Sequence, residues 1–482
     1  MLHPRLLLAA VGLVSLLGQA YARPPPTTVS NPKAKFLVNR NVPGIPFALN
    51  DSYAGYLPVS EKPKDKDREI FFWAFPADKP TKNTVLWLQG GPGCSGMEGL
   101  FSENGPFILA YNSTKAVKNP YSWTQAANMI YVDQPIGTGL SKGETKIHNE
   151  NGVAHELLGF LENFFDVFDE FKGDLWLAGE SYAGMYTMYL ADAIYSRPAA
   201  VNAKAGINLK GITTIDAVLS SYYVSAEIPS VPYAIAHQHD LKLSDKFIEK
   251  VVANVSANGL LGYLDKYLKY PPTGPIPMPQ VFSKNPKYSP WNMIADEATR
   301  QIGDSFNIYN TDPKYSWYNY KDPLGAHGQD FSANNFINNQ TGFKEAIHAD
   351  PNIIWRVCSE RKVFVKDWDK SPFPDETVLN RVIDLNTRTV IQHGMQDFIL
   401  IANGTRLMIQ NATFGGLQGF QEQPHRQFIV DGKSQGTFHS ERKVTLIEFN
   451  DAGHMIPTFV PDGALKALRY LIGEIGLDDL GK

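Results

Sequence analysis

Short apolar runs alternate with longer amphipathic stretches from about residue 35 towards the end of the chain. The short runs predict buried strands over 70–75, 85–88, 129–132, 175–178, 389–393 and 444–449. Residues 155–171 place apolar side chains at intervals of three and four, which predicts an amphipathic helix, and a final helix is expected over 462–475. This alternation favours an α/β fold whose mostly parallel sheet is covered on both faces.

The pattern weakens between residues 221 and 369, where the chain is rich in Pro, Tyr and Asn. Long irregular stretches of this composition are typical of loops and insertions rather than of a sheet core. We therefore expect an inserted cap over 221–369, between the two parts of the core at 35–220 and 370–482. No internal repeat is evident.

The N-terminus has the pattern of a secretory signal peptide. Arg5 precedes an apolar run over about 6–17, and Ala20-Tyr21-Ala22 forms a small-x-small cleavage site. The run is too short to span a bilayer, so residues 1–22 are predicted to be removed. Residues 23–34 form a Pro-rich lead, expected to be disordered or a propeptide. The mature chain is expected outside the cytosol, either secreted or in a vacuole or lysosome-like compartment, without a membrane anchor.

Glycosylation signals and cysteine content agree with that compartment. The two cysteines, Cys94 and Cys358, are expected to be bridged rather than free in an oxidising environment. Six sequons are candidate glycosylation sites: Asn50, Asn112, Asn254, Asn339, Asn403 and Asn411.

Charge and motif content narrow the possible partners. The net charge is −4 without a basic stripe, so a nucleic acid or an anionic membrane surface is not expected as a partner. Two cysteines cannot form a zinc–cysteine cluster, and the sequence has no HExxH pair. We expect no metal.

The sharpest local signal is the segment 174–194, DLWLAGESYAGMYTMYLADAI, in which an apolar strand turns directly into a helical pattern. Ser181 at this turn has the placement of a nucleophile elbow, with the small residues Gly179 and Ala183 two positions on either side. A strict GxSxG motif would have glycine at 183, whereas here Gly184 follows one residue later. The alternative is a serine that merely caps the helix.

A serine nucleophile requires a general base and an acid that orients it. His454 and Asp397 both follow predicted strands, and their chain order is that of an α/β-hydrolase triad. His393 is expected inside a strand as a structural residue, Asp384 falls in a helical stretch, and Asp451 is too close to His454 in sequence. The Gly-rich segment after the strand at 85–88 would supply the Gly91 amide to an oxyanion hole, together with the Tyr182 amide.

At these residues the chain resembles the serine carboxypeptidase family of the α/β-hydrolase superfamily, and a fungal-type secreted member is expected. The resemblance rests on WLQGGPGCSG at 87–96, GESYAGMY at 179–186, HGMQDF at 393–398 and AGHMIP at 452–457. It implies Ser181, Asp397 and His454 as the triad and peptide C-termini as the substrate, with no cofactor. If Glu103 and Glu180 lie side by side, they resist double ionisation, so peptide hydrolysis is expected to favour mildly acidic pH.

The resemblance also assigns a site for the substrate's terminal carboxylate. Glu103 and Glu180 would form a hydrogen-bonded pair supported by Trp87 and Gln89, with Gly90 alongside. Met455 would line the leaving-group pocket, and a Cys94–Cys358 disulfide would tie the cap to the oxyanion loop. The chain departs from the family in having Gln89 where Asn is common and in lacking the other cap disulfides.

Two alternative functions remain open from the sequence. An esterase or acyltransferase on the same scaffold would keep the triad but would not depend on the Glu103–Glu180 pair. A binding protein that has lost catalysis would not need the triad, so the presence of all three triad residues argues against it.

Overall fold

The computed structural model describes residues 31–482, except 61, 63, 64, 111, 114, 318–321, 328, 329, 361 and 367. The predicted signal peptide and most of the Pro-rich lead lie outside the described residues. Within the part of the chain that is described, no helix is long and apolar enough to cross a membrane.

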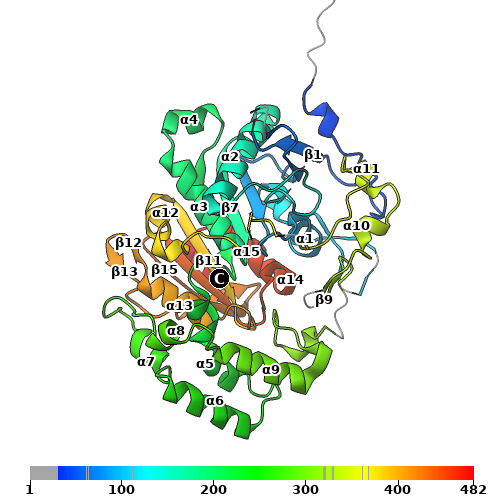
Figure 1. Ribbon diagram of the computed structural model, residues 1–482. Helices are drawn as coiled ribbons and strands as arrows, with labels where there is room; N and C mark the ends of the chain where they lie inside the picture. The colour runs from blue at the N-terminus through cyan, green and yellow to red at the C-terminus, as the bar shows by residue number, and fades with distance from the viewer. Residues whose placement is uncertain are drawn as a thin grey trace, which may run out of the picture.

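A ten-stranded sheet organises the molecule, in the order β1-β2-β6-β3-β7-β8-β11-β16-β15-β14 (Figure 1). Its strands are β1 Tyr53–Pro58, β2 Glu69–Phe75, β3 Asn83–Leu88, β6 Asn128–Asp133, β7 Asp174–Glu180, β8 Leu209–Ile215, β11 Arg388–Gly394, β14 Arg426–Val430, β15 Lys433–Glu441 and β16 Val444–Phe449. The six strands from β6 to β16 in this order are parallel. At both edges of the sheet the outer strands pair antiparallel to their neighbours. The sequence predicted β2 and five of the six parallel strands, and it missed β1, β8, β14 and β15.

Successive residues of a strand face two separate cores. In β2, Phe71 and Trp73 pack with α1 (Gly96–Ser102) and α15 (Pro461–Leu471) on one face of the sheet. Phe72 and Ala74 pack on the other face, with α2 (Glu150–Val167), α3 (Ala183–Ser196) and α12 (Leu379–Leu385). This period-two burial on both faces confirms the predicted α/β architecture.

The two predicted helices exist, but their ends differ from the prediction. The first begins at Glu150 instead of 155, because the Asn149 side chain accepts a hydrogen bond from the Gly152 amide and caps the helix. It ends at Val167, and a short 3₁₀ turn, Asp169–Phe171, follows. The last helix ends at Leu471 rather than at 475, and Gly473 adopts a left-handed φ of +80° beyond its end.

Between β8 and β11 the described chain adds no strand to the main sheet. Helices α5–α9 gather on one side of the molecule around an apolar cluster of their own (Figure 1). They are α5 Ser230–Ala236, α6 Asp245–Ala257, α7 Tyr263–Tyr267, α8 Gln280–Lys284 and α9 Pro290–Ile302.

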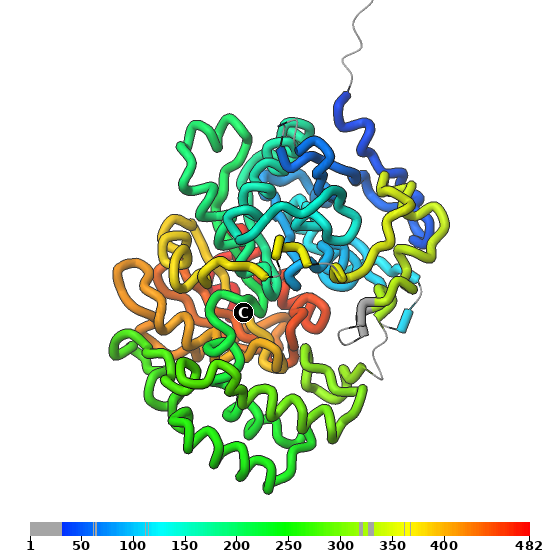
Figure 2. The backbone as a smooth tube through the Cα atoms, in the orientation of Figure 1, coloured from blue at the N-terminus to red at the C-terminus, as the bar shows by residue number. Residues whose placement is uncertain are grey.

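The later part of this region returns to the N-terminal side. It contains the short strands β9 (Ala326–His327) and β10 (Asp330–Phe331) and the helices α10 (Phe336–Asn339) and α11 (Phe343–Ala346). These helices run beside the start of the described chain (Figure 2), where a Cβ atom at Gly44 would meet the Phe336 ring at 2.6 Å. The cap boundaries at 221 and 369 stay a prediction.

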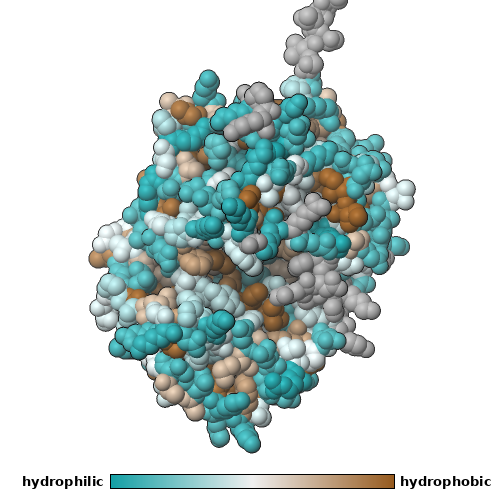
Figure 3. Space-filling view, viewed as in Figure 1, coloured by the Kyte–Doolittle hydropathy of each residue, from teal (hydrophilic) through white to brown (hydrophobic). Residues whose placement is uncertain are grey.

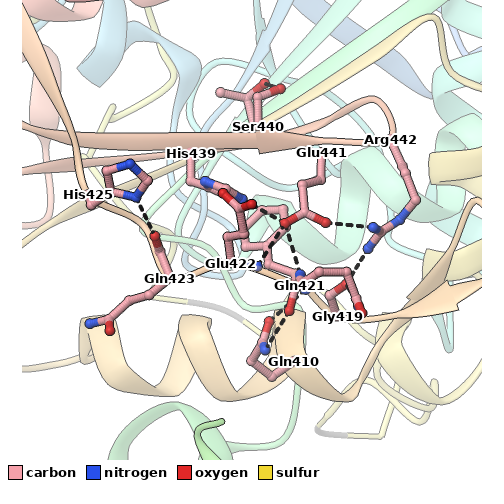
Figure 4. A network of polar contacts seen from close by, with 12 residues as sticks. Gln410, Gly419, Gln421, Glu422, Gln423, His425, His439, Ser440, Glu441 and Arg442 are labelled. Carbon is pink, nitrogen blue, oxygen red and sulfur yellow. Dashed lines mark hydrogen bonds and ion pairs between the residues drawn. The ribbon is translucent and has the colours of Figure 1, made fainter. Parts of the chain in front are cut away.

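A polar network around Glu441 stabilises the antiparallel edge of the sheet formed by β14 and β15 (Figure 4). The Glu441 carboxylate lies 2.8 Å from His439 Nε2 and accepts hydrogen bonds from the Gln421 amide and from Arg442. Burial opposes ionisation of Glu441, but these hydrogen bonds prevail and lower its pKa. The network ties the loop after α13 (Ala402–Asn411) to β15.

Candidate active site

The carboxyl ends of five parallel strands meet along one edge of the sheet. The register pairs Leu88 of β3 with Gly179 of β7, and Ile215 of β8 with both Glu180 and Gln392. The residues that follow these ends lie together because parallel strands all end at the same edge. Gln89, Ser181, Asp216, Asp397 and His454 all follow such ends.

Ser181 occupies a strained turn between β7 and α3. Its φ is +59°, in the left-handed region that side chains other than glycine rarely adopt. The turn is tight: a Cβ atom at Gly179 would meet the Ala183 carbonyl at 2.7 Å, and one at Gly184 would meet the Val218 carbonyl at 2.6 Å. Tyr182, not Ser181, is the N-cap of α3, and no side-chain cap is formed. The capping alternative for Ser181 is therefore wrong.

His454 and Asp397 form a buried pair beside this turn. His454 Nδ1 lies 2.7 Å from Asp397 Oδ2, and Oδ1 accepts hydrogen bonds from the amides of Ile399 and Leu400. The carboxylate is thereby fixed to hold one imidazole tautomer. The other ring nitrogen, Nε2, is buried and has no hydrogen-bond partner among the described residues, as a general base awaiting a substrate would.

The other acids and bases considered from the sequence have different surroundings in the structure. His393 is buried in β11, where its Nε2 lies 3.0 Å from the Leu400 carbonyl and its Nδ1 lies 2.9 Å from the Thr405 hydroxyl. Asp451 is exposed in the loop before His454, and Asp384 lies within α12. Of the acids and bases considered from the sequence, the structure pairs Asp397 with His454.

The Gly-rich segment after β3 lies directly against the Ser181 turn. A Cβ atom at Gly90 would meet both Ser181 Cβ and the Tyr182 amide nitrogen at 2.7 Å, and Gly91 has a φ of +109°. The Tyr182 side chain is anchored as well, with its hydroxyl 3.1 Å from Glu150 Oε1 and 2.9 Å from Asp369 Oδ2. This close approach suits backbone amides that must converge on one oxyanion.

Next to the triad, Gln89 joins two glutamates in a buried cluster. Gln89 Nε2 donates to Glu180 Oε1 at 2.7 Å and to Glu103 Oε1 at 3.4 Å. Trp87 Nε1 donates to Gln89 Oε1 at 2.8 Å, which fixes the direction of the amide. Gln89, which stands where Asn is common in the family, thus contacts both glutamates.

Both glutamates hold their protons well above the ordinary pH range of a carboxyl group. Burial raises the pKa of Glu103 to about 7, against the opposing effect of hydrogen bonds from Glu180 and Gln89. Burial and the neighbouring charge of Glu103 raise the pKa of Glu180 well above its usual value. Each residue keeps one buried carboxyl oxygen, Oε2, without a partner among the described residues. A neutral carboxyl of this kind can donate a hydrogen bond to a substrate carboxylate.

Ser181, His454, Gln89 and Glu180 share one cavity of about 120 Å³. It is lined by Gln89, Gly90, Gly91, Cys94, Glu98, Glu180, Ser181, Tyr309, Trp317, Asp322, Cys358, Ile399, His454 and Met455. Figure 3 shows a hollow on this face, between the sheet and the α5–α9 helices, with hydrophobic side chains in it. The predicted disulfide is present: Cys94 and Cys358 are bonded and lie at the wall.

Several residues that line the cavity were not predicted from the sequence, most of them because they come from the irregular region. Tyr309 accepts a hydrogen bond through its carbonyl from the His454 amide at 2.7 Å, and its ring centre lies 5.3 Å from the imidazole. Trp317 and Asp322 line the cavity from segments without a regular pattern. Glu98 lies on α1, five residues after the Gly-Pro-Gly turn, and could have been suspected from that position.

Asp216 was also missed, although it follows β8 as Asp397 follows β11. It is fully buried, its Oδ1 accepts a hydrogen bond from the Gly394 amide, and it lies 3.3 Å from His393 Nε2. One oxygen each of Asp216 and Asp397 and one nitrogen of His454 lie within 4.8 Å of one another. Burial and the charge of Asp397 raise the pKa of Asp216 well above its usual value, which opposes ionisation of Asp216 beside Asp397.

Comparison with known proteins places the chain in a family. The family model for serine carboxypeptidases matches residues 43–474. A "Probable serine carboxypeptidase" of Arthroderma benhamiae is 34% identical over 470 residues, covering 92% of this chain and 86% of that protein. A "Carboxypeptidase Y homolog" of the same fungus is 36% identical over 463 residues, covering 93% and 89%.

A solved structure supports the fold. The prohormone-processing carboxypeptidase Kex1 of Saccharomyces cerevisiae superposes with a TM-score of 0.73 at 22% identity, covering 92% of this chain and 97% of that one. The match of the family model over most of the chain, together with relatives above 30% identity, settles membership. The chain belongs to the serine carboxypeptidase family, whose members are hydrolases that act at the C-termini of peptides.

Proposed function

We propose that Ser181 carries out the reaction of this carboxypeptidase by forming an acyl-enzyme with the peptide substrate. Ser181 Oγ attacks the carbonyl of the last peptide bond while His454 Nε2 takes the hydroxyl proton. The oxyanion is held by the amides of Gly91 and Tyr182. His454 then returns the proton to the leaving amine, the C–N bond breaks and the C-terminal amino acid departs. Water, deprotonated by His454, hydrolyses the ester and restores Ser181.

The Gln89–Glu103–Glu180 cluster carries the proposal for an exopeptidase. Gln89 and Glu180 line the same cavity as Ser181, and Glu103 is hydrogen-bonded to Gln89. The raised pKa values of both glutamates favour neutral carboxyl groups, beside which a terminal residue could place its free carboxylate. An esterase would have no use for this buried acid pair. The polar atoms left unpartnered in it are the donors and acceptors that a carboxylate would satisfy.

The same cluster sets the pH preference that we propose. As pH rises through about 7, Glu103 ionises and the pair repels an incoming carboxylate. Peptide hydrolysis should therefore be favoured at mildly acidic pH and should fall on the alkaline side. An ester or a C-terminal amide has no free carboxylate to bind at the pair. The alkaline limb of its pH–activity profile should therefore lie at higher pH.

We also propose that the enzyme works in a secretory compartment, either outside the cell or in a vacuole or lysosome-like organelle. The support is the N-terminal signal pattern, the six sequons and the disulfide. The mature chain would then begin near Arg23.

One comparison tests the proposed function. An acylated dipeptide, its C-terminal amide and the corresponding ester are hydrolysed by the wild-type protein and by Glu180→Gln across pH 4–9. For the wild-type protein, we expect kcat/KM to fall towards pH 8 with the free acid alone. Glu180→Gln should raise KM for the free acid and leave KM for the ester unchanged. If all three substrates share one pH profile, the carboxylate site is wrong, and an esterase or acyltransferase becomes the better account.

A further inference from the structure

A second aspartate, which the proposed mechanism does not use, lies against the proposed catalytic pair. Asp216 follows β8 as Asp397 follows β11, and β8 and β11 are neighbours in the sheet. The Asp216 side chain is completely buried. One oxygen each of Asp216 and Asp397 and one nitrogen of His454 lie within 4.8 Å of one another. The acid that orients the proposed base therefore has a second carboxyl group beside it.

The backbone holds Asp216 in an unusual conformation. Its φ is +42°, a value that side chains other than glycine seldom adopt, although Asp and Asn tolerate it better than most. The Asp216 amide donates to the Gln392 carbonyl at 3.0 Å, and Asp216 Oδ1 accepts a hydrogen bond from the Gly394 amide at 2.9 Å. Because both contacts are made with β11, the direction of the Asp216 carboxyl group is fixed.

His393, the other base beside Asp216, is satisfied without a positive charge. Its Nε2 lies 3.3 Å from Asp216 Oδ1, but the same nitrogen lies closer, at 3.0 Å, to the Leu400 carbonyl. Its Nδ1 lies 2.9 Å from the Thr405 hydroxyl, which can donate to it. Burial lowers the pKa of His393 and so favours the neutral ring. His393 therefore does not supply a counter-ion for Asp216.

The other charges that face Asp216 are mainly those of acids. Burial and the charge of Asp397 raise the pKa of Asp216, and Glu103 acts in the same direction. Asp216 in turn contributes to the raised pKa of Glu180. His454 faces the two aspartates, and its Nδ1 is engaged by Asp397. Two neighbouring buried carboxyl groups resist double ionisation, so a single proton between them is favoured, and that proton can form a hydrogen bond from one to the other.

The hydrogen-bond donors around each aspartate indicate which one carries the proton. Asp397 accepts from the amides of Ile399 and Leu400 at Oδ1 and faces the imidazole at Oδ2. Asp216 has one amide donor at Oδ1, and its buried Oδ2 has no partner among the described residues. Because donors stabilise an anion, this arrangement favours the negative charge on Asp397 and the proton on Asp216.

We propose that protonated Asp216 is a positioning residue, which donates a hydrogen bond to Asp397 and thereby weakens the hold of that carboxylate on the His454 imidazolium. This inference rests on the proposed function, since it takes Asp397 and His454 as the pair that activates Ser181. A carboxylate that accepts a further hydrogen bond stabilises a neighbouring cation less. His454 can then act as a base at lower pH, which suits an enzyme whose proposed carboxylate site works best in mild acid.

Two substitutions at position 216 separate this role from a structural one. Asp216→Gly suits the φ of +42° but removes the carboxyl group. Asp216→Asn keeps an acceptor for the Gly394 amide and an N–H group for Asp397, but it cannot ionise. Both are compared with the wild type on an ester, which has no free carboxylate to bind at the Glu103–Glu180 pair. The measured quantity is the acid limb of kcat/KM, the pH range in which His454 becomes protonated and activity is lost.

We expect Asp216→Gly to move the acid limb to higher pH by about one unit, because the bare Asp397 carboxylate holds the imidazolium more strongly. Its kcat at pH 5 should fall roughly tenfold, the lower end of the range for losing a hydrogen bond to a charged group, with little change in KM. Asp216→Asn should restore the wild-type acid limb and most of kcat, because its amide donates in place of the protonated carboxyl group.

Asp431→Gly is the matched control. Asp431 has a φ of +47° at an exposed position between β14 and β15, at the edge of the sheet, and the same substitution there should leave the acid limb and kcat as in the wild type. Urea unfolding shows whether each variant is folded. Infrared difference spectra of the wild type and Asp216→Asn at pH 6 provide a test that does not depend on the glycine variant. They should contain the C=O stretching band of a protonated carboxyl group in the wild type alone.

Three results would overturn the inference. It fails if folded Asp216→Gly keeps the wild-type acid limb, because Asp216 would then be structural. It fails if Asp216→Asn loses ester hydrolysis as severely as Asp397→Asn, because Asp216 would then act as an anion. It also fails if the band of the protonated carboxyl group is absent. In each case, release of C-terminal residues that Ser181→Ala abolishes would leave the proposed function intact. If Asp397→Asn keeps full ester activity, the proposed triad and this inference both fall.

Discussion

Replacing Glu103 with Gln should change how the stability of the protein depends on pH. Glu103 is 2% exposed, and burial raises its pKa from the ordinary value of 4.5 to about 7. The folded protein therefore keeps a proton on Glu103 that the unfolded chain releases. A carboxyl pKa that is raised by folding makes the free energy of unfolding fall as pH rises from the unfolded value towards the folded value.

The size of the effect follows from the two pKa values. The shift spans two and a half pH units, from 4.5 to about 7, and each unit corresponds to about 1.4 kcal/mol. Glu103 thus destabilises the folded wild-type protein by roughly 3 kcal/mol at pH 8 and by almost nothing at pH 4. Glu103→Gln keeps a hydrogen-bonding side chain of similar size but cannot ionise. The free energy of unfolding of Glu103→Gln, relative to that of the wild type, should therefore increase by roughly 3 kcal/mol from pH 4 to pH 8.

Urea unfolding at half-unit steps from pH 4 to pH 8 measures this difference through the midpoint and slope of each transition. Glu249→Gln, an exposed position on α6, is the matched control and should run parallel to the wild type at every pH. Titrating groups remote from Glu103 cancel in the difference, whereas Glu180, whose pKa the charge of Glu103 raises, also contributes to it. Parallel curves for Glu103→Gln and the wild type would show that Glu103 is not a neutral buried acid, and the explanation of the acidic pH preference would fail with it.

Three other substitutions or measurements probe separate parts of the structure. Asp397→Asn should lower kcat for peptides and esters alike by roughly 10³–10⁴ with little change in KM, because the imidazole loses the partner that fixes its tautomer; steady-state kinetics on both substrates would check this. Replacing Cys94 and Cys358 with Ser should cost roughly 5–6 kcal/mol in the chain-entropy model, since the bridge joins residues 264 apart, and should lower the midpoint of thermal unfolding. Peptide mapping after glycosidase treatment should find glycans at the exposed sequons and little or none at the half-buried Asn254 and Asn403. The exposed sequons are Asn50, Asn112, Asn339 and Asn411.

The centre of the sheet was predictable because its strands are short, apolar and buried on both faces. The segment 85–88 carries that pattern without interruption and became β3. β8 was missed because Lys210 and Gly211 interrupt its apolar pattern, and only its neighbours β7 and β11 make it a strand. The edge strand β15 was missed because polar side chains dominate it, and its identity depends on antiparallel pairing with β14 and β16.

The candidate triad was predictable because each of its residues follows a strand that the sequence reveals. The same reasoning would have found Asp216 if β8 had been recognised. The cavity wall that includes Glu98 and Asp322 could not be predicted as a unit, because the two residues are more than two hundred positions apart and Asp322 lies in a region without periodicity. The parts of a site that regular elements hold can be predicted from local patterns, whereas those supplied by irregular segments require tertiary structure.

The most direct test of the account is to follow the masses of a peptide of known sequence during digestion by the wild-type protein and by Ser181→Ala. We predict that the wild type shortens the peptide one residue at a time from its C-terminus and leaves a C-terminally amidated copy much longer intact at acidic pH. Ser181→Ala, with an unchanged unfolding transition, should lose activity by a factor on the order of 10⁶ in kcat. Trimming that persists in Ser181→Ala, or cleavage by the wild type at internal bonds with the C-terminus left in place, would contradict the assignment of Ser181 as the nucleophile of a carboxypeptidase.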